Sequence, residues 1–79
     1  MYFLIDYDRA EGQIVTLRTF DNSELKQAQD ARLNLELQLN LTGIDHEIVL
    51  LEAASEEAVR RTHRRYFEDL VGLTTIPSN

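Results

Sequence analysis

Residues 25–43 read LKQAQDARLNLELQLNLTG, and the conformation of this stretch decides the fold. Between Leu33 and Leu41, leucine alternates strictly with Asn, Glu and Gln, which taken alone is typical of a strand. Leu, Glu and Gln are nevertheless good helix formers, and the stretch has no β-branched residue before Thr42. The capping sequence Asp-Asn-Ser-Glu precedes it, and Gly43 ends it as a stop signal. We therefore predict a helix over about residues 22–41.

A helix at this position carries more leucine than one sheet can cover. At about 100° per residue, its apolar side chains fall on two stripes. The first stripe consists of Leu25, Ala28, Ala31, Leu35 and Leu39, and the second, on nearly the opposite side, of Leu33, Leu37 and Leu41. Only one stripe can pack on a sheet, so the other must be covered by a second helix or by a partner chain. The sequence leaves open which of these two covers it.

Three other segments are predicted to be strands. Residues 2–8 (YFLIDYD) and 14–20 (IVTLRTF) are rich in aromatic and β-branched residues, and the glycine-containing loop 9–13 joins them as an antiparallel hairpin. Residues 46–52 (HEIVLLE) are apolar on both faces, which is typical of a strand covered on both sides.

Strand periodicity also predicts how the hairpin side chains are arranged. In the second strand, Val15 and Leu17 share one side, and the other side carries Ile14, Thr16, Arg18 and Phe20. We expect Asp6 to pair with Arg18 across the hairpin and Asp8 to begin the turn.

A second helix follows the third strand. Ser55 is a good N-cap, Glu56 and Glu57 suit the positive end of the helix dipole, and Gly72 ends the predicted helix. Its expected apolar face consists of Val59, Thr62, Tyr66, Phe67 and Leu70.

The element order β-β-α-β-α predicts an α+β fold with a small, mainly antiparallel sheet. We expect the strand order 2-1-3, with parallel pairing of the third strand to the second as the alternative, and both helices on one face. The other face, with Tyr2 and Leu4, would then be uncovered. Residues 1–71 are predicted to form a single domain and residues 72–79 a flexible C-terminal tail.

Composition narrows the functional classes. The chain has 79 residues, no cysteine and a net charge of −6, so disulfides and thiolate zinc sites are excluded and nucleic acid and anionic membranes are disfavoured as partners. We see no secretory signal and no apolar run of membrane-spanning length, which predicts a cytoplasmic protein. Nucleotide-binding and nucleophile motifs are missing, and His46 lacks metal-ligand spacing. We expect no enzyme activity, no cofactor and no metal.

The most conspicuous charged feature is the run RRTHRR. It places Arg60, Arg61, Arg64 and Arg65 on one helix together with His63, and such a cluster could bind an anion or a partner. The alternative is a self-paired, solvated face, because each arginine has an acidic residue four positions away, in the pairs Glu56–Arg60, Glu57–Arg61, Arg64–Glu68 and Arg65–Asp69. His63 falls on the apolar face of the helix and is expected to be a packed residue.

Three stretches together resemble a family of short bacterial proteins to which no activity is assigned. They are YFLIDYDR at the start, ARLNLEL in the first helix and VLLEAASEEAVRRTHRRYF near the end, and they span about residues 2–67. The resemblance implies a small stand-alone protein and supplies no catalytic residue.

Two functions are compatible with the sequence. The first is a non-catalytic interaction module, an adaptor, regulator or accessory subunit for a protein partner not yet identified. It would act as a homodimer whose interface is formed by Leu33, Leu37, Leu41, Tyr2 and Leu4. The alternative is a ligand- or nucleic-acid-binding protein that uses the surface formed by Arg60, Arg61, Arg64 and Arg65, which we call the arginine face.

Overall fold

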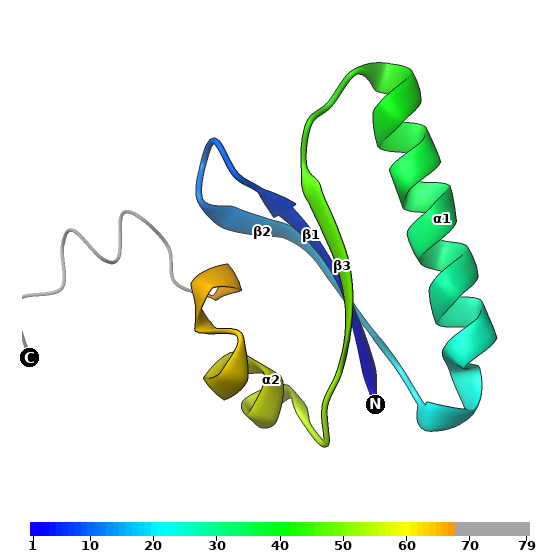
Figure 1. Cartoon of the computed structure of the whole chain (residues 1–79), viewed down its shortest axis with the longest axis vertical. Coiled ribbons are helices and arrows are strands. Elements are labelled where there is room, and N and C mark those ends of the chain that lie inside the picture. The colour runs from blue at the N-terminus through cyan, green and yellow to red at the C-terminus, as the bar shows by residue number, and fades with distance from the viewer. Residues whose placement is uncertain (68–79) are drawn as a thin grey trace, which may run out of the picture.

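The computed structural model describes residues 1–67, which form an antiparallel sheet with helices packed on it (Figure 1). The strands are β1 (Tyr2–Asp8), β2 (Gln13–Phe20) and β3 (Glu47–Glu52), and the helices are α1 (Leu25–Thr42) and α2 (Glu56–Thr62). The sheet order is β2-β1-β3, with both pairings antiparallel. These observations confirm the predicted α+β class and strand order and exclude the parallel alternative. The predicted tail, residues 72–79, lies outside the described residues.

The ends of α1 explain why the alternating leucines form a helix. At the N-terminal end, the Glu24 carboxylate accepts a hydrogen bond from the backbone N–H of Asp21 at 2.8 Å, as the capping sequence predicts. At the C-terminal end, Gly43 adopts a left-handed conformation with φ of 73°, and the N–H of Ile44 reaches back to the carbonyl of Leu39 at 2.9 Å. This Schellman motif satisfies the last carbonyls of the helix. The predicted helix is therefore confirmed, although its first turn, Asn22–Glu24, is a 3-10 helix and α1 itself covers Leu25–Thr42.

The two helices cover opposite faces of the sheet (Figure 1). Ala28 of α1 packs with Leu4 and Phe20 in one buried cluster. On the other face, Tyr66 follows α2 and its ring meets the edge of the Tyr7 ring at a centroid distance of 5.2 Å. Our prediction that both helices lie on one face was wrong. The physical reason is that β1 and β3 are apolar on both sides, so each face of the sheet needs its own cover.

This arrangement also corrects the predicted uncovered face. Leu4 is only 1% exposed, and Tyr2 packs against the same cluster beneath α1. Leu4 therefore belongs to the core and cannot line an interface.

A β-bulge in the hairpin changes which side chains share a face. Asp6 is opposite Thr16 but Tyr7 is opposite Ile14, so Val15 is an extra residue in β2 and is 55% exposed. Ile14 consequently turns to the α2 side of the sheet, where it joins Leu17. The prediction that Ile14 shares a face with Thr16 was wrong, because regular alternation does not reveal an inserted residue.

The second helix is shorter than predicted. Ser55 caps α2 by accepting from the N–H of Ala58 at 3.1 Å, as expected, but the helix ends at Thr62, which is exposed. His63 leaves the helical conformation, with φ of −124° and ψ of 52°, and a 3-10 turn follows over Arg64–Tyr66. The predicted end at Gly72, and Leu70 on the apolar face, lie outside the described residues. Within residues 1–67, neither helix has the length and apolar character needed to cross a membrane.

The left-handed residue at the end of α1 gives a test of this fold. A Cβ added at Gly43 would meet nothing within 4 Å, so only the backbone conformation opposes substitution. We expect Gly43→Ala to lower the free energy of unfolding by about 1–2 kcal/mol in urea denaturation. Gly43→Asn is the matched control. It should lose less unfolding free energy than Gly43→Ala, because Asn tolerates the left-handed conformation better than Ala does. Equal losses in the two variants would contradict this explanation.

Candidate interaction surfaces

The outer side of α1 carries an exposed row of leucines, which we call the leucine face: Leu33, Leu37 and Leu41. Ala28, Ala31 and Leu35 turn toward the sheet, whereas the three leucines on the far side are 57%, 57% and 78% exposed. Because α2 packs on the opposite face of the sheet, it does not cover them (Figure 1). The sequence left open whether a second helix or a partner chain covers this stripe. Within residues 1–67, the second helix does not cover it.

The C-terminal part of the leucine face, around Leu37 and Leu41, is poor in charge, whereas Leu33 lies beside the Arg32–Glu36 ion pair. The ion pairs of α1, Lys26–Asp30 at 3.4 Å and Arg32–Glu36 at 3.6 Å, involve only its first twelve residues. Residues 37–44 (LQLNLTGI) contain no charged side chain. Depletion of charge around exposed apolar residues is the composition found at the centre of protein–protein interfaces.

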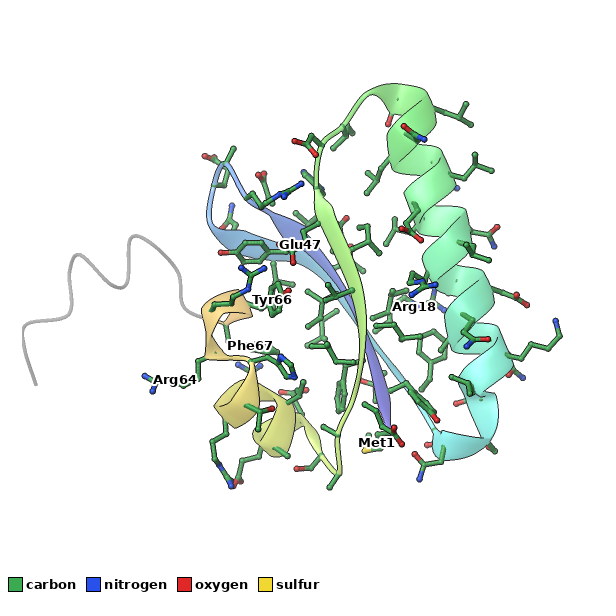
Figure 2. The ribbon with its side chains drawn as sticks, in the orientation of Figure 1. Met1, Arg18, Glu47, Arg64, Tyr66 and Phe67 are labelled. Atoms are coloured by element: carbon green, nitrogen blue, oxygen red, sulfur yellow. The ribbon has the colours of Figure 1, made fainter. Side chains whose placement is uncertain are left out.

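The arginine face does not gather its guanidinium groups at one point. Arg60 and Arg61 pair with Glu56 and Glu57 at 2.9 Å and 2.7 Å, as the i,i+4 spacing predicts. Arg65 instead reaches β3, and Arg64 projects away from the sheet (Figure 2). The predicted partners Glu68 and Asp69 lie outside the described residues. Within the described part of the chain, this face therefore offers no convergent anion site, and its role in binding stays a prediction.

The contact of Arg65 belongs to a cluster that fastens the segment after α2 to the sheet. The Tyr66 hydroxyl donates to the Glu47 carboxylate at 2.6 Å, and Arg65 donates to both oxygens of that carboxylate at 2.6 Å (Figure 2). The hydroxyl of Tyr66, together with Arg65, holds the pKa of Glu47 below its ordinary value, and burial raises the pKa of Tyr66. Sequence reasoning missed this cluster, because 18 residues separate Glu47 from Arg65.

His63 lies beside this cluster without entering it. Its side chain is half-buried, and its ring centroid is 6.5 Å from that of Tyr66. This half-buried position agrees with the prediction that His63 is a packed residue.

A second polar cluster fastens the connection between α1 and β3. Asp6 is 3% exposed, and its carboxylate lies 2.8 Å from Nδ1 of His46, whose Nε2 is 3.6 Å from Asp8. The predicted pairing of Asp6 with Arg18 was wrong, because Arg18 lies over the Phe20 ring instead. Asp8 begins the turn as predicted, since it accepts from the N–H groups that follow it. No group of three or more His, Asp or Glu residues within residues 1–67 is arranged to hold a metal ion.

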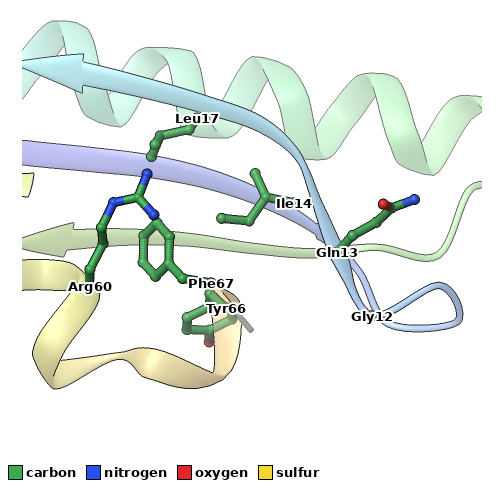
Figure 3. Close-up of a pocket in the computed structure, with 7 residues that line it drawn as sticks. All are labelled: Gly12, Gln13, Ile14, Leu17, Arg60, Tyr66 and Phe67. Carbon is green, nitrogen blue, oxygen red and sulfur yellow. The ribbon is translucent and has the colours of Figure 1, made fainter. Parts of the chain in front are cut away.

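An open pocket of about 250 Å³ lies between β2 and the segment around α2 (Figure 3). Its lining is mostly apolar, from Ile14, Leu17 and Phe67, and Arg60 lies over the Phe67 ring at 4.6 Å. The described lining includes no carboxylate and no histidine, and the hydroxyl of its one tyrosine, Tyr66, is hydrogen-bonded to Glu47 and Arg65.

Comparison with protein-family models, with curated proteins and with solved structures finds no match for this chain. The resemblance to short bacterial proteins consequently has no counterpart among these comparisons.

The cluster around Glu47 makes the stability of the fold depend on pH. A carboxyl group whose pKa is lower in the folded state stabilises the fold above its unfolded-state pKa of about 4.3, and this contribution is lost as the pH falls through the folded-state value. We expect Glu47→Gln to lower the free energy of unfolding at about pH 7 by about 1.5–3 kcal/mol, and by much less at about pH 3. Urea denaturation at the two pH values measures the difference.

Glu57→Gln is the control for this prediction. It removes an ion pair whose side chains are both mostly exposed, so its effect should stay below about 1 kcal/mol at either pH. If wild type and Glu47→Gln lose stability in parallel as the pH falls, the cluster does not have this role.

Proposed function

We propose that this chain is a small non-catalytic interaction module that acts as a homodimer through the leucine face of α1. The observation that carries the proposal is the exposure of Leu33, Leu37 and Leu41 on the side of α1 that faces away from the sheet. Three large apolar side chains in a row are more than a monomer usually leaves in water. The small size of the chain supports the same proposal. A domain of this size buries little apolar surface, and burial of further surface in an oligomer would stabilise it.

A second copy fits this surface because the stripe is compatible with two-fold symmetry. If two α1 helices cross antiparallel with Leu37 at the axis, Leu37 meets its own copy and Leu33 meets the partner's Leu41. No charged residue lies between positions 37 and 44, so this arrangement brings no like charges together there.

The magnitudes indicate a weak dimer. Complete burial of a leucine side chain contributes about 1.5–3 kcal/mol, and more than half of each of these side chains is exposed. The six leucines of two copies therefore contribute roughly 6–12 kcal/mol, against an association cost of about 4–15 kcal/mol. The balance places the dissociation constant in the micromolar range or above, so the association must be measured at tens of micromolar.

The test is to place a charge at the symmetry axis. Leu37→Glu would bring two carboxylates together in an apolar contact, and we expect it to weaken self-association by about tenfold or more in sedimentation velocity. We expect the Leu37→Glu variant to remain folded, because position 37 faces solvent and Glu is a good helix former.

Gln27→Glu adds the same charge to the same helix away from the leucine face, and it should associate like the wild type. A wild-type chain that sediments as a monomer at about 100 μM would refute the proposed homodimer.

A further inference from the structure

The two edges of the sheet differ in how well they are protected. The edge strand β2 is interrupted by the bulge at Val15, which distorts its outer edge. The edge strand β3 pairs with β1 in an unbroken register over all six of its residues, Glu47–Glu52, and contains no Pro, Gly or Lys. A regular, mostly apolar edge strand of this kind can pair with another extended chain.

The register identifies the backbone groups that β3 leaves for such a chain. The N–H of Ala53 donates to the carbonyl of Met1 at 3.0 Å, so this pair belongs to the hydrogen-bonded class of an antiparallel ladder. Because the N–H and C=O groups of successive residues point alternately to the two sides of a strand, those of residues 47, 49 and 51 also point toward β1. The N–H and C=O groups of Ile48, Leu50 and Glu52 point outward, and no loop or side-chain hydrogen bond within residues 1–67 reaches them.

A hollow of about 260 Å³ lies beside this edge, between α1 and β3. Its apolar part comes from Leu39, Ile44 and Ile48. Its polar part consists of the carboxylates of Glu36 and Asp45 together with Asn40 and His46. Both acids have exposed ion-pair partners, Arg32 and Arg9, and such pairs are weak enough to be exchanged. The hollow therefore suits a long side chain with an apolar stem and a cationic head.

Charge also decides between a second copy and a different partner at this edge. Residues 44–57 contain five acidic residues and no Lys or Arg, and four of the five pair with arginines from elsewhere in the chain. The chain as a whole still carries a net charge of −6, so two copies paired through β3 would repel each other, whereas a basic segment would be attracted. An extended segment that carries Lys or Arg at alternate positions complements the same surface.

We infer that β3 accepts an extended, Lys- or Arg-bearing segment of a partner protein as a fourth strand, with a basic side chain in the hollow beside Ile48. In this form of recognition, main-chain hydrogen bonds supply affinity and side-chain pockets supply specificity. The inference rests on the proposed role as an interaction module, but it uses a different surface from the leucine face.

The test uses two synthetic probes and the full-length, nitrogen-15-labelled chain at low salt. One peptide alternates Val with Lys, and the other alternates Val with Glu, so the two share strand propensity and differ in charge. We expect the Lys peptide to slow amide hydrogen exchange at Ile48, Leu50 and Glu52, and the Glu peptide to have no effect. In Glu36→Gln/Asp45→Asn the affinity for the Lys peptide should fall by about tenfold.

Glu52→Pro tests the backbone contribution. The N–H of Glu52 points away from β1, so proline is compatible with the sheet there but removes an outward donor, and binding should weaken by about tenfold with the thermal transition kept. Exchange that is unaffected by the Lys peptide, or already slow in the free chain, would overturn the inference. Protection that increases with protein concentration would assign the edge to a second copy and would also overturn it. The titration is repeated in Leu37→Glu, which weakens self-association through the leucine face but leaves β3 unchanged. Binding of the Lys peptide to this variant tests the edge of β3 independently of the proposed homodimer.

Discussion

The structure depends on the burial of β1 from both sides. Phe3, Leu4 and Ile5 are consecutive residues that are at most 1% exposed, and consecutive side chains of a strand point to opposite faces. Both faces of a three-stranded sheet must therefore be covered, and the described chain has one helix for each. This constraint explains why α1 and α2 are separated by the sheet (Figure 1).

Each helix consequently covers its face alone. Within residues 1–67, no second layer lies over α1, so the leucine face is at the surface, and the three described strands leave an open edge at β3. These two surfaces differ in chemistry, since residues 37–44 carry no charge, whereas residues 44–57 contain five acidic residues, four of them paired with arginines from elsewhere in the chain. A neutral apolar stripe suits a second copy of the chain, whereas an acidic edge suits a basic partner.

The two polar clusters lie at adjacent positions of the sheet and on opposite faces. Asp6 holds His46 on the α1 side, and Glu47, the strand partner of Tyr7, holds Tyr66 and Arg65 on the α2 side. Each cluster fastens an irregular segment, the connection before β3 and the turn after α2. In so small a fold, such hydrogen bonds between distant segments define a single arrangement that apolar contacts alone would leave loose.

The sequence by itself determined the elements that depend on local signals. The caps around α1 and α2 and the turn at Asp8 are set by neighbouring residues. The hairpin and the helical crossover favoured the strand order 2-1-3, but the structure was needed to exclude parallel pairing of β3 with β2. Only the tertiary structure decided which face each helix covers, where Asp6 and Arg65 find their partners, and that Val15 is an inserted residue. These features arise between residues far apart in the chain or from a local break in register, and neither leaves a periodic signal in the sequence.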